Sequence, residues 1–498
     1  MASIHPQSSS MAEPGRLAAV PEGSSAPPPR SLYSDWIRTV PVSGAQRRST
    51  MRPTIFGHSG SSYSTSASSS CPSNNSGHSS GSASAFALER LGNQELWRIA
   101  RQMISDGYTQ RMVQAFDGTS PAPALLANWF SVLDVDWVLQ IHDEHGLRRL
   151  LQDKPATTRD LADKWIRALT VIVTSITELH FDIQTPAGAL FGKASITGLL
   201  DVVDVIITLL QAEKLEVMLD MFTVVCRVSG MLPPVNISPD GQSVFNEAGG
   251  LLERERNRLI EIISNTVEEV RTLIEEDDSW AIEIPRGGAE VHNNTRFITD
   301  CIVSMMNAQT STRISAPSHY SENLGGLIDG TIDYLKALLF TKSESCSDQS
   351  LRYLFLINNS YFVARGVFES SGSFIPELWY LTFPPECKKY MDSYLDVSWG
   401  PMLSCLPKLR SPGLIHRLIN TPSLAKFESA FHKTYQAQKF WKVPDPKLRN
   451  DLRRAITERV ISGYRDYLEG HPEIEKHVGR ESRSPEVLQE MLGQLFEG

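Results

Sequence analysis

The chain has 498 residues, 41% of them hydrophobic, and a formal net charge of −9 at pH 7, so it is long enough to bury large cores. Its six cysteines are widely scattered without a C-x-x-C pair, which excludes a dense disulfide framework and indicates a reducing compartment. The longest apolar stretches, residues 168–176 and 199–210, stop well short of the ~20 residues that a membrane span requires. We therefore expect any membrane contact to be peripheral.

Residues 1–84 differ in composition from the rest of the chain. A proline run at 27–29 and a serine-rich tract at 59–85 cannot bury enough apolar surface to offset chain entropy. We therefore expect a disordered Ser/Pro/Gly-rich tail over residues 1–84. Its serines fit regulation by phosphorylation and an unregulated tail equally well.

From residue 85 to residue 498 the hydrophobic pattern is that of helices. Apolar residues step by threes and fours through the segments 88–116, 125–141 and 161–179, and no alternating pattern typical of strands competes with them. The sequence therefore predicts an all-α domain over residues 85–498.

A long amphipathic helix is expected at about residues 245–276, and it ends in four consecutive acids, Glu275 to Asp278. The helix macrodipole disfavours negative charge there by roughly a few tenths of a kcal/mol for each acid. The acids are interpreted either as a solvated helix end or as a contact for a basic partner.

A loop with Pro285, Gly287 and Gly288 leads into the next helix. The glycines turn the chain, and Asn294 or Thr295 can cap the helix. His292 has no Cys, Asp or second His at ligand spacing, so we expect a hydrogen-bonded loop residue rather than a base or a metal ligand.

The run from Leu351 to Tyr361 reads LRYLFLINNSY. Leu351, Leu354, Phe355 and Asn358 share one side of a helix. Asn358 and Asn359 are therefore predicted to be core amides that bond to neighbouring helix ends or loops.

Residues 427–468 predict a helical hairpin. Phe427, Phe431, Tyr435 and Gln438 recur at helical steps before Pro444-Asp445-Pro446 breaks the pattern. A second helix is expected after Pro446, with Asp445 as its cap. Its buried face is predicted to hold Leu448, Leu452, Ile456, Val460 and Tyr464.

This hairpin is basic in an acidic protein, with ten Lys or Arg and four Asp or Glu between Lys426 and Arg465. Lys447, Arg454 and Arg465 return to nearly the same azimuth at ~100° per residue. The pattern indicates either a surface for an anionic partner or a plain solvated helix face. A nucleic-acid partner is disfavoured because the aromatic residues occupy core spacing and do not alternate with the cations.

No motif supports catalysis, a cofactor or a metal. The segment from Gly188 to Ser195 is similar to a phosphate loop, but its glycine spacing is one residue short and Ala194 replaces the magnesium-binding Ser or Thr. We expect a helix-linking turn there, and a protein that is not an enzyme.

Three of these motifs together resemble the seventy-kilodalton subunit family of the exocyst, in its expanded plant-type branch. They are the F-x-x-x-F and Q-x-x-W-x-V-x-D-x-x-L-R runs of the hairpin, the P-x-G-x(4)-H-x-x-T-R loop at 285–296, and the LRYLFLINNSY run. The segment 91–116 and the run Leu219-Asp220-Met221-Phe222, followed by Leu232-Pro233, add to the likeness.

The resemblance implies an elongated rod of stacked antiparallel helical hairpins in a peripheral, non-enzymatic subunit that tethers secretory vesicles to the plasma membrane. Other exocyst subunits, a phosphoinositide membrane and small GTPases or immune signalling proteins are the implied partners. The implied location is cytoplasmic, with recruitment to the plasma membrane or vesicles. The residues expected to bind phosphatidylinositol 4,5-bisphosphate are Lys442, Lys447, Arg449, Arg453, Arg454, Lys476, Arg480 and Arg483.

Two departures from the family leave an alternative open. The serine-rich segment stands where the family has a long N-terminal helix, and the family's lysine-tyrosine-isoleucine-lysine motif is replaced by Lys476-His477-Val478-Gly479. The alternative is a non-catalytic helical adaptor in plant immunity or membrane trafficking that works outside the assembled exocyst.

Overall fold

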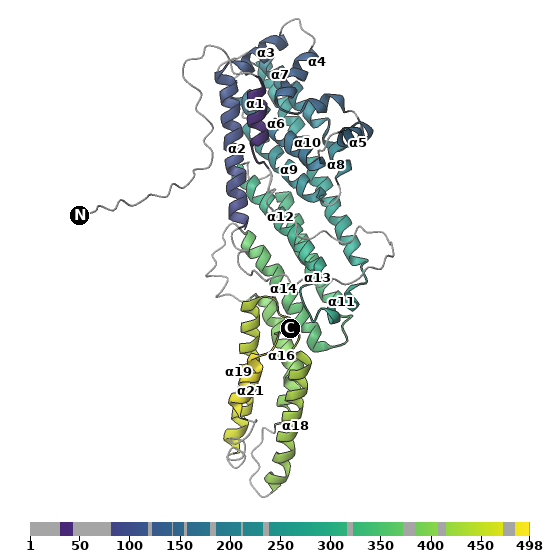
Figure 1. Ribbon diagram of the computed structural model, residues 1–498, viewed down its shortest axis with the longest axis vertical. Coiled ribbons are helices and arrows are strands. Elements are labelled where there is room, and N and C mark those ends of the chain that lie inside the picture. Colours follow the sequence, from purple (N-terminus) through teal and green to yellow (C-terminus); the bar gives the residue numbers. More distant parts are fainter. Residues whose placement is uncertain are drawn as a thin grey trace, which may run out of the picture.

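The computed structural model describes residues 30–42, 81–117, 122–141, 143–153, 157–179, 186–210, 213–232, 239–315, 322–371, 384–406, 415–471 and 484–497. Across these ranges the chain is built of helices, and the only extended pairing is an isolated bridge between Lys442 and Glu497. The helices stack along one long axis into a rod (Figure 1). The predicted all-α class and rod shape are therefore confirmed.

One end of the rod is formed by the first part of the chain (Figure 1). Its centre is α6, which packs against α2, α7 and α9 and whose apolar run, residues 168–176, is almost completely buried. The elements of this end are α1 (Arg30–Thr39), α2 (Gly81–Ser105), α3 (Tyr108–Asp117), α4 (Ala122–Val132), η2 (Asp136–Gln140), α5 (Glu144–Asp153), α6 (Thr158–Leu179), α7 (Pro186–Leu200), α8 (Val203–Leu209), α9 (Lys214–Met231) and α10 (Pro239–Glu275).

The rod continues because each later helix packs on an earlier one. Helix α12 packs on α9, α14 on α12 and α16 on α14, and α18, α19 and α21 form the far end (Figure 1). The elements of this part are α11 (Trp280–Arg286), α12 (Asn293–Ser315), α13 (Glu322–Ser343), α14 (Gln349–Ser370), α16 (Pro385–Ser398), α17 (Gly400–Leu403), α18 (Ile415–Gln438), α19 (Pro446–Gly470) and α21 (Pro485–Gly493).

The predicted hairpin is present as α18 and α19. The Asp445 carboxylate accepts a hydrogen bond from the Leu448 N–H at 2.9 Å and caps α19. The Phe427 and Tyr464 rings stack across the two helices with centroids 4.9 Å apart. The residues predicted for the inner faces are all buried.

The expected tail over residues 1–84 is corrected at two places. Residues 30–39 form helix α1, in which Tyr33 and Ile37 are buried, and α2 begins at Gly81. The apolar pattern of α1 covers only ten residues and is flanked by prolines and serines. The composition of the region therefore concealed the helix. The other residues of 1–84 lie outside the described residues.

The turn predicted from Gly188 to Ser195 is wrong, because these residues lie inside α7. A Cβ atom added at Gly192 would come within 2.7 Å of Ile176 Cδ1 on α6. The glycine therefore allows two helices to approach closely, and it does not break the chain.

Two other glycines give a test of helix stability. Gly249 and Gly250 lie inside α10, and an added Cβ would meet nothing within 4 Å at either position. We expect Gly249→Ala and Gly250→Ala each to raise the free energy of unfolding by about 0.5–1 kcal/mol, since alanine loses less backbone entropy in a helix. The midpoint of unfolding in guanidinium chloride measures this change in stability. Gly192→Ala is the matched control and is expected to lower the midpoint, and a decrease for all three would contradict the prediction.

Candidate functional site

The three sequence motifs meet at one junction, where the body of the rod joins the α18–α19 hairpin. Asn358 on α14 donates from Nδ2 to the carbonyl oxygen of Ala289 at 2.7 Å and to that of Lys442 at 2.9 Å. One amide therefore bonds to the loop before α12 and to the corner between α18 and α19. The Lys442 N–H also donates to the Gly288 carbonyl oxygen at 2.9 Å.

Asn359 fixes the same loop from the next position. Its Oδ1 accepts from the His292 N–H at 3.0 Å, and its Nδ2 donates to the Phe355 carbonyl oxygen at 2.8 Å. Gly288 and Ala289 take positive φ angles of 60° and 67°, so the loop makes a tight left-handed bend. Both asparagines are buried, and the prediction of bonded core amides is confirmed.

His292 is buried between Trp280 and the start of α12. Its ring stacks on Trp280 at a centroid distance of 3.7 Å, its Nδ1 accepts from the Asn294 N–H at 3.2 Å, and its Nε2 lies 2.8 Å from a Glu283 carboxylate oxygen. His292 therefore caps α12, whereas Asn294 and Thr295, which were expected to cap it, lie inside the helix. Burial lowers the pKa of His292, although Glu283 opposes that shift.

The acidic end of α10 has partners within the molecule. The Lys342 ammonium group donates to the carbonyl oxygens of Glu275 and Asp277 at 2.7 and 2.8 Å, and the Asn294 side chain donates to an Asp277 carboxylate oxygen at 2.7 Å. A cation at these carbonyl groups offsets the unfavourable position of the acids.

The corner of the hairpin is joined to α14 by an ion pair. Arg365 lies 2.7 Å from the Asp445 carboxylate and 2.8 Å from that of Glu369. The same Asp445 caps α19, so one carboxylate sets both the start of the helix and its attachment to the body. No signal in the sequence separated Arg365 from an ordinary surface arginine.

Three of the predicted lipid-binding cations have structural partners. Arg449 Nε donates to the Val443 carbonyl oxygen at 3.0 Å, and Arg453 Nε donates to the Leu495 carbonyl oxygen at 2.8 Å. Lys447 lies 2.8 Å from the Asp451 carboxylate and is only 21% exposed. These residues hold the corner and the C-terminal segment in place.

Two others are more open to solvent. The Arg454 side chain is 68% exposed and pairs with Asp451 at 2.7 Å, and Lys442 is 46% exposed and pairs with Glu290 at 3.2 Å. The remaining three predicted residues, Lys476, Arg480 and Arg483, lie outside the described residues. The structure therefore brings five predicted cations together near the start of α19, and Arg454 and Lys442 are the more exposed of them.

Within the described ranges, no group of His, Cys, Asp and Glu could hold a metal ion, and no helix is long and apolar enough to cross a membrane. Burial raises the pKa of the Cys226, Cys301 and Cys387 thiols to about 12. Such thiols are poor nucleophiles at neutral pH. The contacts described at the junction, those of Asn358, Asn359 and Arg365, hold helices together. The residues of the junction therefore define a helical scaffold.

The chain belongs to the exocyst family that its sequence resembles. The family model for the C-terminal region of the Exo70 exocyst complex subunit matches residues 189–494. Among curated proteins of Arabidopsis thaliana, exocyst complex component EXO70A3 is 26% identical over 308 residues, which are 57% of this chain and 50% of that protein. EXO70E2 is 24% identical over 453 residues, which are 80% of this chain and 64% of that protein.

The chain spans about half the length of the first relatives that it matches. A solved structure of Saccharomyces cerevisiae Exo70 aligns with 83% of this chain and 88% of its own at 12% identity, with a TM-score of 0.43.

The junction gives a test of its central amide. We expect Asn358→Ala to lower the free energy of unfolding by about 1–3 kcal/mol, because the buried carbonyl oxygen of Ala289 and the partly buried one of Lys442 lose their donor. Chemical denaturation measures the change. Asn450→Ala, at an exposed position of α19, is the matched control and is expected to change stability by less than about 0.5 kcal/mol. Equal effects of the two substitutions would contradict the role of Asn358.

The lowered pKa of His292 predicts a pH dependence. The unfolded chain binds a proton at His292 more readily than the folded chain does, so this residue reduces stability as the pH falls through the ordinary histidine range near 6.5. Above that range the neutral ring keeps its full contribution. We expect His292→Asn, which retains a capping side chain, to flatten the dependence of the unfolding midpoint between pH 7 and pH 5. A slope unchanged from the wild type would argue against a titrating His292.

Proposed function

We propose that the chain acts as a peripheral, non-enzymatic exocyst-type subunit that helps to tether secretory vesicles to the plasma membrane. The single observation that carries the proposal is the family match over residues 189–494. The relatives that match are named as exocyst complex components. In this role the partners are other exocyst subunits, and recruitment from the cytoplasm to the membrane is peripheral.

The membrane contact in this proposal is phosphatidylinositol 4,5-bisphosphate, bound at the basic end of the rod. Lys442 and Arg454 provide exposed charge beside α19, and Arg465 on the same helix is 51% exposed. Lys476, Arg480 and Arg483 are the further cations of the proposed surface. Each cation near an anionic bilayer adds ~1 kcal/mol, so a few of them give reversible attachment that salt weakens.

Small GTPases are further partners in the proposed role of a tethering subunit. The alternative function is that of a helical adaptor for immune or trafficking proteins outside the assembled exocyst. It is favoured by the structural use of Lys447, Arg449 and Arg453, which reduces the charge that a membrane can engage.

Vesicle sedimentation distinguishes these functions. We expect Lys442→Glu, Arg454→Glu and Lys476→Glu together to weaken binding to phosphatidylcholine vesicles containing phosphatidylinositol 4,5-bisphosphate by at least about 100-fold. The melting temperature is expected to change little, because exposed surface pairs contribute at most about 1 kcal/mol each. The control reverses three exposed cations elsewhere, Arg101, Arg148 and Lys336. Wild-type binding that is absent, or equal on vesicles without the phosphoinositide, would support the adaptor instead.

A further inference from the structure

The N-terminal segment formed by α1 and residues 40–42 lies against helices that follow it much later in the chain. Helix α1 packs on α2 and α4, and it is drawn beside α2 at one end of the rod (Figure 1). Tyr33, Ile37 and Val40 are each at most 3% exposed to solvent. A helix of ten residues is marginal in water on its own, so its helicity depends on this contact.

The surface beneath α1 is lined by aromatic rings. The Tyr33 ring lies 5.5 Å from the Tyr108 ring, and Tyr108 in turn lies 6.2 Å from Trp129. Trp129 lies 5.6 Å from Phe191 on α7. Tyr33 therefore links the Trp36 ring of α1, 5.9 Å away, to a row of rings that belong to the body of the rod.

The polar groups that face α1 are held by residues of the body. The Tyr33 hydroxyl donates to Asp106 Oδ2 at 2.5 Å, while Asp106 Oδ1 accepts from Gln102 at 2.9 Å. Arg38 donates to Asp134 Oδ1 at 2.8 Å, and Lys164 lies 3.0 Å from the other oxygen of that carboxylate. Both carboxylates are therefore positioned without help from α1.

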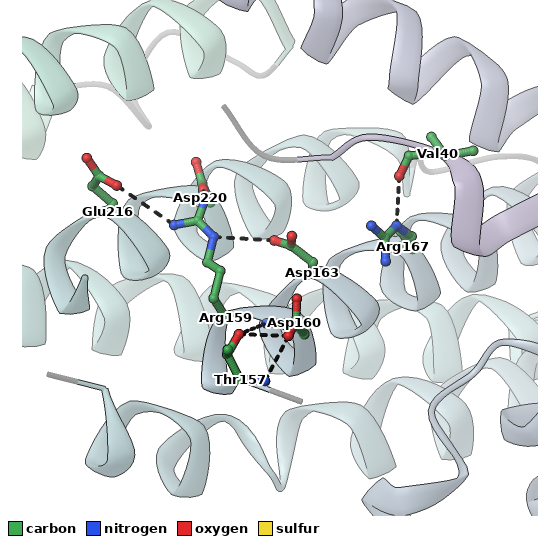
Figure 2. Close-up of polar contacts among 8 residues, drawn as sticks. All are labelled: Val40, Thr157, Arg159, Asp160, Asp163, Arg167, Glu216 and Asp220. Carbon is green, nitrogen blue, oxygen red and sulfur yellow. Dashed lines mark hydrogen bonds and ion pairs between the residues drawn. The ribbon is translucent and has the colours of Figure 1, made fainter. Parts of the chain in front are cut away.

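The residues after α1, 40–42, also lie against a surface that fits their backbone. Arg167 Nε on α6 donates to the Val40 carbonyl oxygen at 2.8 Å, as Figure 2 shows. A Cβ atom at Gly92 on α2 would lie 2.1 Å from the Pro41 carbonyl oxygen, so only glycine leaves room for this backbone.

Helix α6, which supplies Lys164 and Arg167, is itself anchored. Arg159 lies 3.5 Å from Asp163 on the same helix and 2.5 Å from Asp220 on α9 (Figure 2). At its start, Thr157 and Asp160 exchange hydrogen bonds in a capping box. The surface beneath α1 is thus built on a helix that is anchored to α9 and capped at its start.

We propose that the surface formed by α2, α3, α4 and α6, with the turns that follow α2 and α4, is a binding site for an amphipathic helix, and that residues 30–42 are its tethered ligand. The site is defined by Gly92, Asp106, Tyr108, Asp134 and Arg167, and we term it the α1 seat. A preorganised surface loses little freedom on binding, and because the ligand belongs to the same chain its binding is intramolecular and is favoured over that of a separate helix. Release of the segment opens the seat to a helix with the same order of groups: an aromatic residue, an aliphatic residue four positions later and an arginine directly after it.

Fluorescence anisotropy with a labelled peptide of residues 30–42 tests this proposal on the full chain. Tyr33→Asp with Ile37→Asp disables the tethered segment and leaves the seat intact. We expect the peptide to bind this double variant at least about 10-fold more tightly than it binds the wild type, in which the seat is occupied. A peptide that carries the same two substitutions is expected not to bind.

The seat is tested by a further substitution in the double variant. Asp134→Asn keeps a residue that tolerates the positive φ of 61° but removes the charge that meets Arg38, and we expect it to weaken peptide binding. Asp329→Asn, at an exposed position of α13 and away from Arg38, is the matched control. Circular dichroism of each variant checks that the fold is retained.

Three results would overturn the proposal. The first is no peptide binding to the well-folded double variant, and the second is equal binding to the double variant and the wild type. The third is a wild-type dimer in size-exclusion chromatography that the double variant does not form, because α1 of a second copy would then fill the seat.

Discussion

The shape of the rod depends on the two hydrogen bonds that the Asn358 side chain donates. Its acceptors are backbone oxygens of Ala289 and Lys442, which lie 69 and 84 residues from it along the chain. A buried amide with two such acceptors fixes both segments, since the buried carbonyl oxygen of Ala289 has this donor and the corner at Lys442 is bonded to the same side chain. The hairpin keeps its direction relative to the body because Asn358 and the Arg365–Asp445 ion pair act at the same corner.

Much of the fold could be predicted from apolar spacing. Repeats at three and four residues located α6, α10, α18 and α19, and proline and aspartate marked the start of α19. The spacing of α1 was too short to stand out from a Pro- and Ser-rich region, because its helicity depends on contacts with α2 and α4. Likewise, the glycine at 192 indicated a turn until its contact with Ile176 was visible.

The site was harder to predict than the fold. Azimuth on a helix indicates which cations share a face, but it does not reveal that Arg453 reaches the carbonyl oxygen of Leu495, 42 residues later. His292 is a weak candidate for a helix cap from its residue type alone, and its role depends on Trp280 and Glu283. A hydrogen bond to a distant backbone group does not depend on the spacing of side chains along the sequence, so that spacing cannot predict it.

The position of the junction at one end of a long helix has a mechanical consequence. Helix α19 has 25 residues, which at ~1.5 Å per residue make an arm of about 37 Å. A rotation of about 10° at the corner would displace its far end by roughly 6 Å by the same geometry. Small changes in the hydrogen bonds of Asn358 or in the Asp445 ion pair would thus be amplified along the arm. The two hydrogen bonds that Asn358 donates therefore determine the direction in which α19 points.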